Sequence, residues 1–195
     1  MLKQQPGFSL LELLLACSVG LVLLAVALQS LLAEQRLGGR LGVLLRQRQL
    51  LLRANQLITA DVERGIAIAP ELTPHCNLAG RKLFLQILHP DGGLTTYSVG
   101  ASGSPIWQGQ VLMRCGPAYG IDGQVRSGAS SQNRVVLDGL MLDSSDWGGC
   151  WLPQAEQLSH QPVCWELKSG LVQWQLQLER DGLKQQRPGQ ALLLG

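Results

Sequence analysis

The stretch Gly7-Phe8-Ser9-Leu10-Leu11-Glu12-Leu13 opens an apolar segment that continues to Ala33. Between Phe8 and Ala33 the only charged residue is Glu12. As a helix, these 26 residues span about 39 Å at about 1.5 Å per residue, which is enough to cross a hydrocarbon core of about 30 Å. The sequence therefore predicts one membrane-spanning helix with a carboxylate close to its start.

The carboxylate of Glu12 needs a partner. An ionised side chain near the centre of a bilayer costs about 2.5 kcal/mol or more, and the dipole at a helix N-terminus offsets part of that cost. The intact chain has no cation at the start of the segment, because Gly7–Phe8 is a neutral peptide bond. Cleavage there would give Phe8 an ammonium group, and the ordinary pKa of an α-amino group is about 7.7–8.0. The cut would thus create the counter-ion that Glu12 lacks.

This stretch resembles the class III signal of type IV prepilins and of the pseudopilins of type II secretion. The resemblance implies that a membrane peptidase cleaves after Gly7 and methylates the amine of Phe8. It also implies that Glu12 pairs with the Phe amine of a neighbouring subunit during filament assembly. Ser9 stands where Thr is more usual. The specific resemblance covers about the first 30 residues.

The segment has two other interpretations. One is an uncleaved single-pass anchor, in which Glu12 is merely tolerated near the membrane interface. The other is an ordinary secretory signal peptide, whose apolar region runs about 7–15 residues and ends in a small-residue cleavage site. The apolar run here is longer and no convincing Ala-x-Ala-like site follows it. We therefore favour the prepilin interpretation.

The charges in the leader and the charges beyond the apolar run predict opposite membrane orientations. Lys3 and the initial amine favour a cytoplasmic N-terminus, whereas several arginines beyond the apolar run argue the other way under the positive-inside rule. They are Arg36, Arg40, Arg46 and Arg48. We expect an inner-membrane protein with its N-terminus in the cytoplasm, because the prepilin resemblance implies dedicated export. Its C-terminal domain would lie in the periplasm, or at the cell surface if the chain joins a pilus.

The resemblance also implies the partners. These are the prepilin peptidase/N-methyltransferase, other pilin or pseudopilin subunits, the inner-membrane assembly platform and membrane lipid. The chain has a net charge of +2, which gives no firm evidence for nucleic-acid binding. The arginines between Arg36 and Arg53 alternate with Gln and Leu, which favours a solvated helix face.

The expected domain organisation is a cleaved leader (1–7), a transmembrane helical half (8–33), a second helical half (34–65) and a β-rich globular domain (66–195). The second half ends near Arg64, with Gly65 as a C-cap. Apolar residues recur along it at helical spacing. They are Leu37, Leu41, Leu44, Leu45, Leu51, Leu52 and Ile58. The glycines of Leu37-Gly38-Gly39-Arg40-Leu41-Gly42 allow two interpretations, a hinge or a site of close helix packing.

Beyond Gly65 the pattern turns to strands. The segments 82–88 and 94–99 predict a hairpin around His89-Pro90-Asp91-Gly92-Gly93. Further strands are expected at 110–115, from 134 and at 172–179, with loops at 100–110 and 143–162. The fold class is therefore α+β and pilin-like, a long helix packed on an antiparallel sheet. The helix exit and Val111-Leu112-Met113-Arg114-Cys115 loosely resemble PilW-like minor pilins and J-type pseudopilins.

The soluble region contains four of the five cysteines, which predicts two disulfides in an oxidising compartment. Three connectivities are open. We favour Cys150–Cys164, which closes a short loop, together with Cys76–Cys115. Cys17 lies in the apolar run and is expected to be a small apolar residue.

No pattern typical of a catalytic site is present, and we expect neither a cofactor nor a metal. The three histidines lie near prolines, and a structural or solvent-exposed role is favoured for them. Three aspartates lie close in sequence, but their spacing fits no EF-hand loop. These residues are His75, His89, His160, Asp138, Asp143 and Asp146.

Two classes of function follow. The first is a minor pilin or pseudopilin, which is a structural subunit incorporated into a type IV pilus-like filament or priming its assembly. The alternative is an uncleaved, membrane-anchored periplasmic binding or enzymatic domain.

Overall fold

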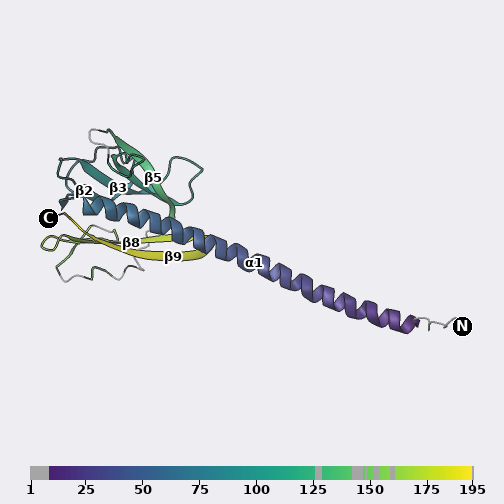
Figure 1. Ribbon diagram of the computed structural model, residues 1–195. Coiled ribbons are helices and arrows are strands. Elements are labelled where there is room, and N and C mark those ends of the chain that lie inside the picture. Colours follow the sequence, from purple (N-terminus) through teal and green to yellow (C-terminus); the bar gives the residue numbers. More distant parts are fainter. Residues whose placement is uncertain are drawn as a thin grey trace. The chain divides into compact units, whose positions relative to one another are not determined.

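The computed structural model describes residues 9–125, 129–141, 147, 149–151, 154–158 and 161–194, without the side chains of residues 36 and 37. The chain divides into two compact units, Met1–Leu45 and Arg46–Gly195, and each is described by itself. The secondary structure is one helix followed by nine strands within the described residues (Figure 1). These elements are α1 (Leu10–Glu63), β1 (Ala67–Ile68), β2 (Lys82–Leu88), β3 (Leu94–Ala101), β4 (Gln110–Pro117), β5 (Ser131–Leu140), β6 (Glu156–Gln157), β7 (Val163–Glu166), β8 (Leu171–Arg180) and β9 (Leu183–Leu192).

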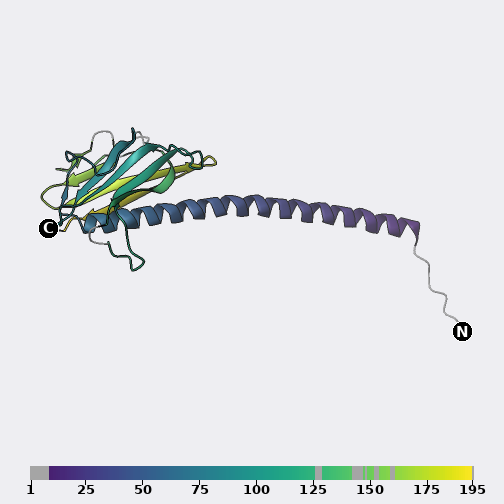
Figure 2. The same cartoon turned by 90° about the horizontal axis from the view of Figure 1, so that it is seen from above.

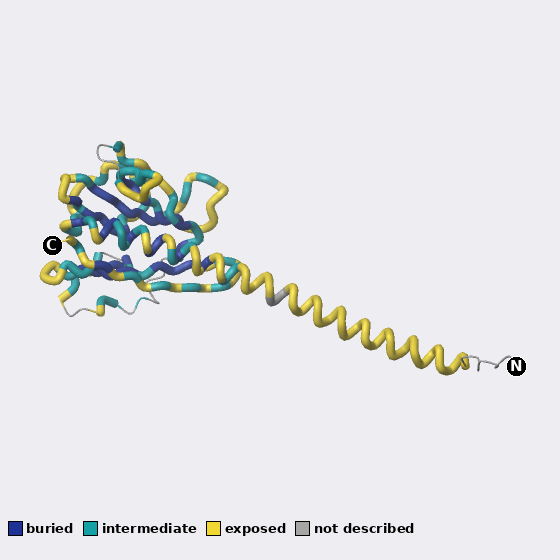
Figure 3. The backbone as a smooth tube through the Cα atoms, viewed as in Figure 1, coloured by how far each residue is buried: buried dark blue, intermediate teal, exposed yellow. Residues whose placement is uncertain are grey.

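The first unit consists of the N-terminal part of α1. Every described side chain from Ser9 to Gly42 is exposed, as the yellow tube of Figure 3 shows. This part of α1 is long and apolar enough to cross a membrane. The helix also continues unbroken through Gly38, Gly39 and Gly42. The hinge and the close-packing interpretations of these glycines both remain predictions.

The second unit is built on an antiparallel sheet with the strand order β1-β2-β3-β4-β5-β8-β7-β6, and β9 pairs with the other edge of β8. Strands β5 and β8 are joined only near their ends, through the Leu140–Leu178 pair and a bond from the Met141 amide to the Gln177 carbonyl. The sheet therefore bends at this corner. Figure 1 shows β2, β3 and β5 on one side of the C-terminal part of α1, with β8 and β9 on the other, and in the view from above in Figure 2 the strands of these two groups overlap. A helix followed by a curled antiparallel sheet confirms the expected α+β class.

The C-terminal part of α1 contributes a narrow buried face to the core. Its apolar members, Leu51, Ala54, Ile58 and Val62, recur every three or four residues and pack with side chains from both parts of the sheet. The predicted apolar stripe was only partly right. Leu51 and Ile58 are buried, but Leu41 and Leu45 are exposed, and the polar residues Gln47, Asn55 and Asp61 share the buried face instead.

Strand prediction was accurate where polar and apolar residues alternate or where a turn separates two apolar runs. The predicted hairpin is β2 and β3, and β2 has the predicted bounds. Strand β8 buries Val172, Trp174, Leu176 and Leu178 as expected. Four strands were missed. They are β1, β6, β7 and β9.

Strand β9 was missed because its composition is atypical of a strand. It contains Pro188 and Gly189, and all but one of its residues retain some exposure. Such a sequence is tolerated at the edge of a sheet, where ladder hydrogen bonds are needed on one side only. Strand β6 lies within the predicted loop at 143–162 and is a two-residue strand paired with β7.

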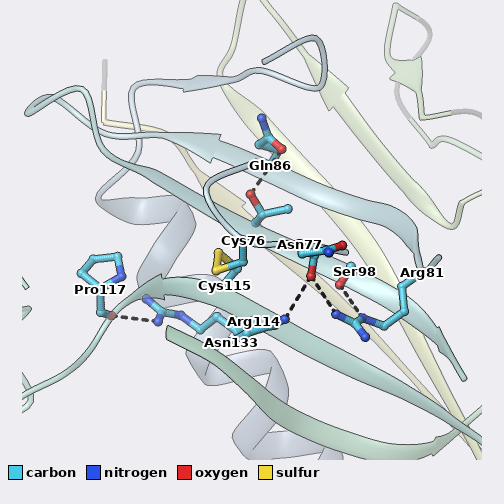
Figure 4. Close-up of a disulfide and its surroundings, with 10 residues drawn as sticks. Cys76, Asn77, Arg81, Gln86, Ser98, Arg114, Cys115, Pro117 and Asn133 are labelled. Atoms are coloured by element: carbon cyan, nitrogen blue, oxygen red, sulfur yellow. Dashed lines mark hydrogen bonds between the residues drawn. A yellow bond between two sulfur atoms is a disulfide. The ribbon is translucent and has the colours of Figure 1, made fainter. Parts of the chain in front are cut away.

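Both disulfide pairs favoured from the sequence are present in the structure, Cys76–Cys115 and Cys150–Cys164. Cys76 lies in the connection between β1 and β2, and Cys115 lies on β4 (Figure 4). The carbonyl of the adjacent Asn77 accepts hydrogen bonds from Arg81 and from Asn133 on β5. The disulfide and these bonds attach the long β1–β2 connection to the sheet.

Gly65 ends α1 for a different reason from the one predicted. A C-cap glycine usually has positive φ, but Gly65 is not among the positive-φ residues. Instead, a Cβ at Gly65 would overlap the side chain of Ile87 and lie 3.2 Å from both Leu193 and the Val62 carbonyl. The glycine thus allows the end of α1 to lie against β2 and the C-terminal segment.

We expect Gly65→Ala to lower the free energy of unfolding by about 1–3 kcal/mol, because the added methyl group overpacks this contact. Thermal unfolding of the full chain in detergent would measure the change. Gly103→Ala is the matched control, because a Cβ at Gly103 meets no atom within 4 Å. Equal stability of the two variants would show that Ile87 moves aside without cost.

Candidate functional site

The first candidate site is the start of α1, where Ser9 and Glu12 bond to each other. The amide of Glu12 donates to Oγ of Ser9 at 3.3 Å, and the amide of Ser9 donates to Oε2 of Glu12 at 3.4 Å. With Leu10 as the first helical residue, this is the reciprocal capping box of a Ser-x-x-Glu sequence. Gly7 and Phe8, the predicted cleavage and methylation residues, lie outside the described residues.

The capping box gives Ser9 and Glu12 a local role beyond those expected from the sequence. It satisfies two amide groups that a helix N-terminus leaves without intrahelical partners. In apolar surroundings, an amide without a partner costs about as much as a lost hydrogen bond or more. Within the described part of the chain Glu12 accepts this bond through Oε2, so its carboxylate retains further capacity to accept hydrogen bonds.

The second candidate site is a buried charged cluster around Asp61, a residue that the sequence indicated only as part of a helix end. Nε and Nη2 of Arg114 on β4 donate to its two carboxylate oxygens at 2.7 and 2.9 Å. The hydroxyls of Tyr97 on β3 and Tyr119 after β4 donate at 2.5 and 2.7 Å. Arg64 completes the set as an ion-pair partner from the same helix. A carboxylate that is fully buried thus accepts five hydrogen bonds.

The arginines in this cluster have further partners. Nη1 of Arg114 donates to the Pro117 carbonyl, and Nε of Arg64 donates to the Ala60 carbonyl, both at 2.9 Å. Each guanidinium carbon also lies 4.9 Å from the ring centroid of Tyr119, within the range of a cation–π contact. The cluster therefore joins the last turns of α1 to two strands of the sheet through bonds that are nearly all made to charged groups.

Burial and charge act in opposite directions on Asp61. Burial alone would raise the pKa of its carboxyl, but the hydrogen bonds and charge of Arg114, with the two tyrosine hydroxyls, hold that pKa below its usual value. Burial and the Asp61 carboxylate raise the pKa of Tyr97 well above its ordinary range and that of Tyr119 to about 12. Burial lowers the pKa of Arg114, but the hydrogen bonds to Asp61 more than reverse that effect and raise it.

These pKa shifts all stabilise the protonation states that the four groups have at neutral pH. At neutral pH Asp61 is ionised, Tyr97 and Tyr119 are protonated and Arg114 is charged. Each polar group already has its partner, so none is free to take up or release a proton as a general acid or base does. The arrangement is suited to fixing the helix on the sheet.

Among the described residues, the histidine and aspartate candidates His75, His89 and Asp138 do not form a metal-ligating group. His89 is buried, with Nδ1 3.3 Å from the Arg64 carbonyl and Nε2 2.8 Å from the Thr95 hydroxyl, which is a structural position. No group of three metal-ligating side chains occurs among the described residues. Asp143, Asp146 and His160 lie outside them.

We expect Asp61→Asn to lower the free energy of unfolding by about 3–5 kcal/mol at pH 7, because Arg114 would then be buried without its counter-ion. Glu63→Gln is the matched control, since Glu63 is an exposed carboxylate in the same turn of α1. Thermal unfolding of the full chain in detergent measures both variants. Equal stability of the two at pH 7 would contradict the role assigned to the cluster.

The Asp61→Asn variant also has an expected pH dependence. Because the folded-state pKa of Asp61 is lowered, its stabilisation is fully present above the unfolded pKa, about 3.9. It is lost as the pH falls from there through the lower, folded-state pKa. The difference in unfolding temperature between the wild type and Asp61→Asn should therefore be constant from pH 7 to about 5 and shrink below about 4.

Residues 2–28 match the family described as the prokaryotic N-terminal methylation motif. The match includes Gly7, Phe8 and Glu12 and extends through the first part of α1. No curated protein and no solved structure matches the chain. The methylation motif, the long apolar helix and the curled antiparallel sheet together form a pilin-like arrangement. The chain thus carries at its N-terminus the methylation motif that is the class III signal of type IV pilins and pseudopilins.

Proposed function

We propose that the chain is a minor type IV pilin or pseudopilin, a structural subunit that enters a pilus-like filament or primes its assembly. The observation that carries this proposal is the register of the methylation motif with α1. Glu12 stands in the first turn of a helix whose exposed apolar surface is long enough for a membrane. A structural role also agrees with the Asp61 cluster, whose groups are all engaged with one another.

The proposed sequence of events begins with hydrolysis of the Gly7–Phe8 bond by the prepilin peptidase. Water adds to the peptide carbon, Gly7 leaves as a carboxylate and Phe8 gains an ammonium group, which methylation keeps charged. Before assembly the apolar part of α1 lies in the inner membrane, with the N-terminus in the cytoplasm and residues 66–195 in the periplasm. In the filament, the Glu12 carboxylate pairs with the Phe8 ammonium of a neighbouring subunit.

The alternative is an uncleaved anchor that holds a periplasmic binding or enzymatic domain. The two proposals differ first in the N-terminus. We expect the protein from cells with an active prepilin peptidase to begin at a methylated Phe8. Intact-mass measurement and N-terminal sequencing without reduction would show this. A chain that still begins at Met1 in such cells would favour the anchor.

The proposals differ also in their dependence on the Glu12 charge. Glu12→Gln removes that charge but keeps a side chain that can complete the capping box with Ser9. We expect normal cleavage, but incorporation into the sheared filament fraction reduced by at least about tenfold, the factor for about 1.4 kcal/mol.

The matched control for this experiment is Glu34→Gln, which removes an exposed carboxylate from α1 just beyond the apolar run. Glu34→Gln should enter filaments as the wild type does. Wild-type incorporation of Glu12→Gln would rule out the proposed pairing, and a defect confined to Glu12→Ala would assign Glu12 to helix capping instead.

A further inference from the structure

A small cavity on the β8–β9 part of the sheet is unconnected with the proposed filament role. Its volume is about 290 Å³, and three tryptophans contribute to its walls. The remaining described lining residues are neutral, with amide, proline and glycine groups and no charged side chain. The full lining is Trp147, Trp151, Gln173, Trp174, Pro188, Gly189 and Gln190.

The disulfide Cys150–Cys164 builds one wall of this cavity. Cys150 lies between Trp147 and Trp151 in the sequence, and Cys164 lies on β7 directly opposite Gln173 on β8. The bond therefore fixes the segment with the two tryptophans beside Gln173. Two glycines separate Trp147 from Cys150, so the local sequence does little to hold two indoles at one place. The covalent link supplies that restraint.

Strand β9 contributes to the cavity wall through a close contact with Trp174. Gly189 pairs in register with Trp174, and a Cβ at Gly189 would overlap the indole ring. The absence of a side chain thus lets the ring lie against the backbone of β9. Nε1 of Trp174 donates to Oδ1 of Asn55 on α1 at 2.5 Å, which adds a second restraint on the ring. Trp174 is in consequence a rigid part of the cavity.

One polar group at the cavity lacks a partner, and a second polar side chain lies beside it. The side chain of Gln173, which is 8% exposed, lines the cavity with an amide that can both donate and accept hydrogen bonds. Nε1 of Trp147 is buried with no acceptor among the described residues. Leaving a buried polar group unsatisfied costs about 1–3 kcal/mol, so native proteins rarely contain such groups without a reason. A bound ligand is one such reason.

The geometry points to a binding site for a neutral saccharide on the cavity formed by Trp147, Trp151, Gln173 and Gly189. The flat indoles match the apolar faces of a sugar ring, and the Gln173 amide matches its hydroxyls, which both donate and accept. The described lining has no cation for an anionic ligand and no carboxylate for a cationic one. The volume is close to the lower limit of ligand pockets, about 300 Å³, which suits one or two sugar units.

A proline-rich peptide is the principal competitor, because such peptides bind aromatic-lined grooves. Its prolines offer only carbonyl acceptors, so the peptide has no group that could donate a hydrogen bond to Oε1 of Gln173. Such a peptide also needs an extended groove rather than one small cavity, because a polyproline II helix rises about 3.1 Å per residue. The amide and the limited volume therefore favour the saccharide.

The test uses the full chain in a polyoxyethylene detergent, because detergents with sugar headgroups would compete. A glycan array gives a first screen, and calorimetry follows with tri-N-acetylglucosamine, cellotriose, maltotriose and, as the peptide probe, decaproline. The variants are Trp151→Ala and Gln173→Met. Trp151 is 69% exposed, so its removal should leave the fold intact, and Trp107→Ala is the control, since Trp107 does not line the cavity.

We expect saturable binding of at least one neutral saccharide, with an affinity at least about tenfold weaker in Trp151→Ala and in Gln173→Met. Trp107→Ala should bind as the wild type does, and all variants should show similar unfolding temperatures. Three results would each overturn the proposal. The first is that no neutral glycan on the array binds, and the second is that decaproline alone binds. The third is that a correctly folded Trp151→Ala variant binds the saccharide with wild-type affinity.

Discussion

The ionised carboxylate of Asp61 is the constraint on which the folded unit depends. It is fully buried, so its charge must be balanced, and it receives hydrogen bonds from α1, from β3, from β4 and from the segment after β4. A buried ion pair adds little net stability over apolar packing, but loss of one partner is severe. The five groups therefore hold one another in a single arrangement. The end of the helix can occupy only the position on the sheet at which all five meet.

Two other polar side chains reinforce that position along the same face of α1. Asn55 accepts the indole N–H of Trp174, and Nε2 of Gln47 lies 3.4 Å from the carbonyls of Arg180 and Leu183, at the β8–β9 turn. Apolar contacts alone are non-directional, so they specify the position of a helix less sharply than hydrogen bonds do. We infer that these hydrogen bonds, together with those of Asp61, are spaced along about four turns of helix and specify the register of α1 between the two parts of the sheet.

The sequence predicted the elements whose signals are local. The membrane-length helix, the β2–β3 hairpin and the alternation of β8 follow from patterns within a few residues of one another. The buried face of α1 could not be found in this way, because Asp61 and Asn55 are polar and their partners lie 53 and 119 residues away. A partial signal was present. Arg114 interrupts a strand of apolar residues, and a cation there requires an anion from another element. Strand β9 had no such signal in its sequence. The need for a glycine at position 189 follows only from the indole of Trp174, which lies against it.

At the start of α1, the Glu12 side chain has to cap the helix and also to pair with an amine of a neighbouring subunit in the proposed filament. The capping box holds the Glu12 side chain against the start of the helix through a long hydrogen bond of 3.4 Å from the Ser9 amide to Oε2, which leaves the other carboxylate oxygen outside the box. On the proposed assembly, a charged amine from a neighbouring subunit approaches that carboxylate in a medium of low dielectric, where an ion pair is much stronger than in water. The incoming amine need not displace the Ser9 amide, because a carboxylate has about four acceptor sites. Helix capping before assembly and ion pairing after it are therefore compatible, and the cap keeps Glu12 oriented until the amine arrives.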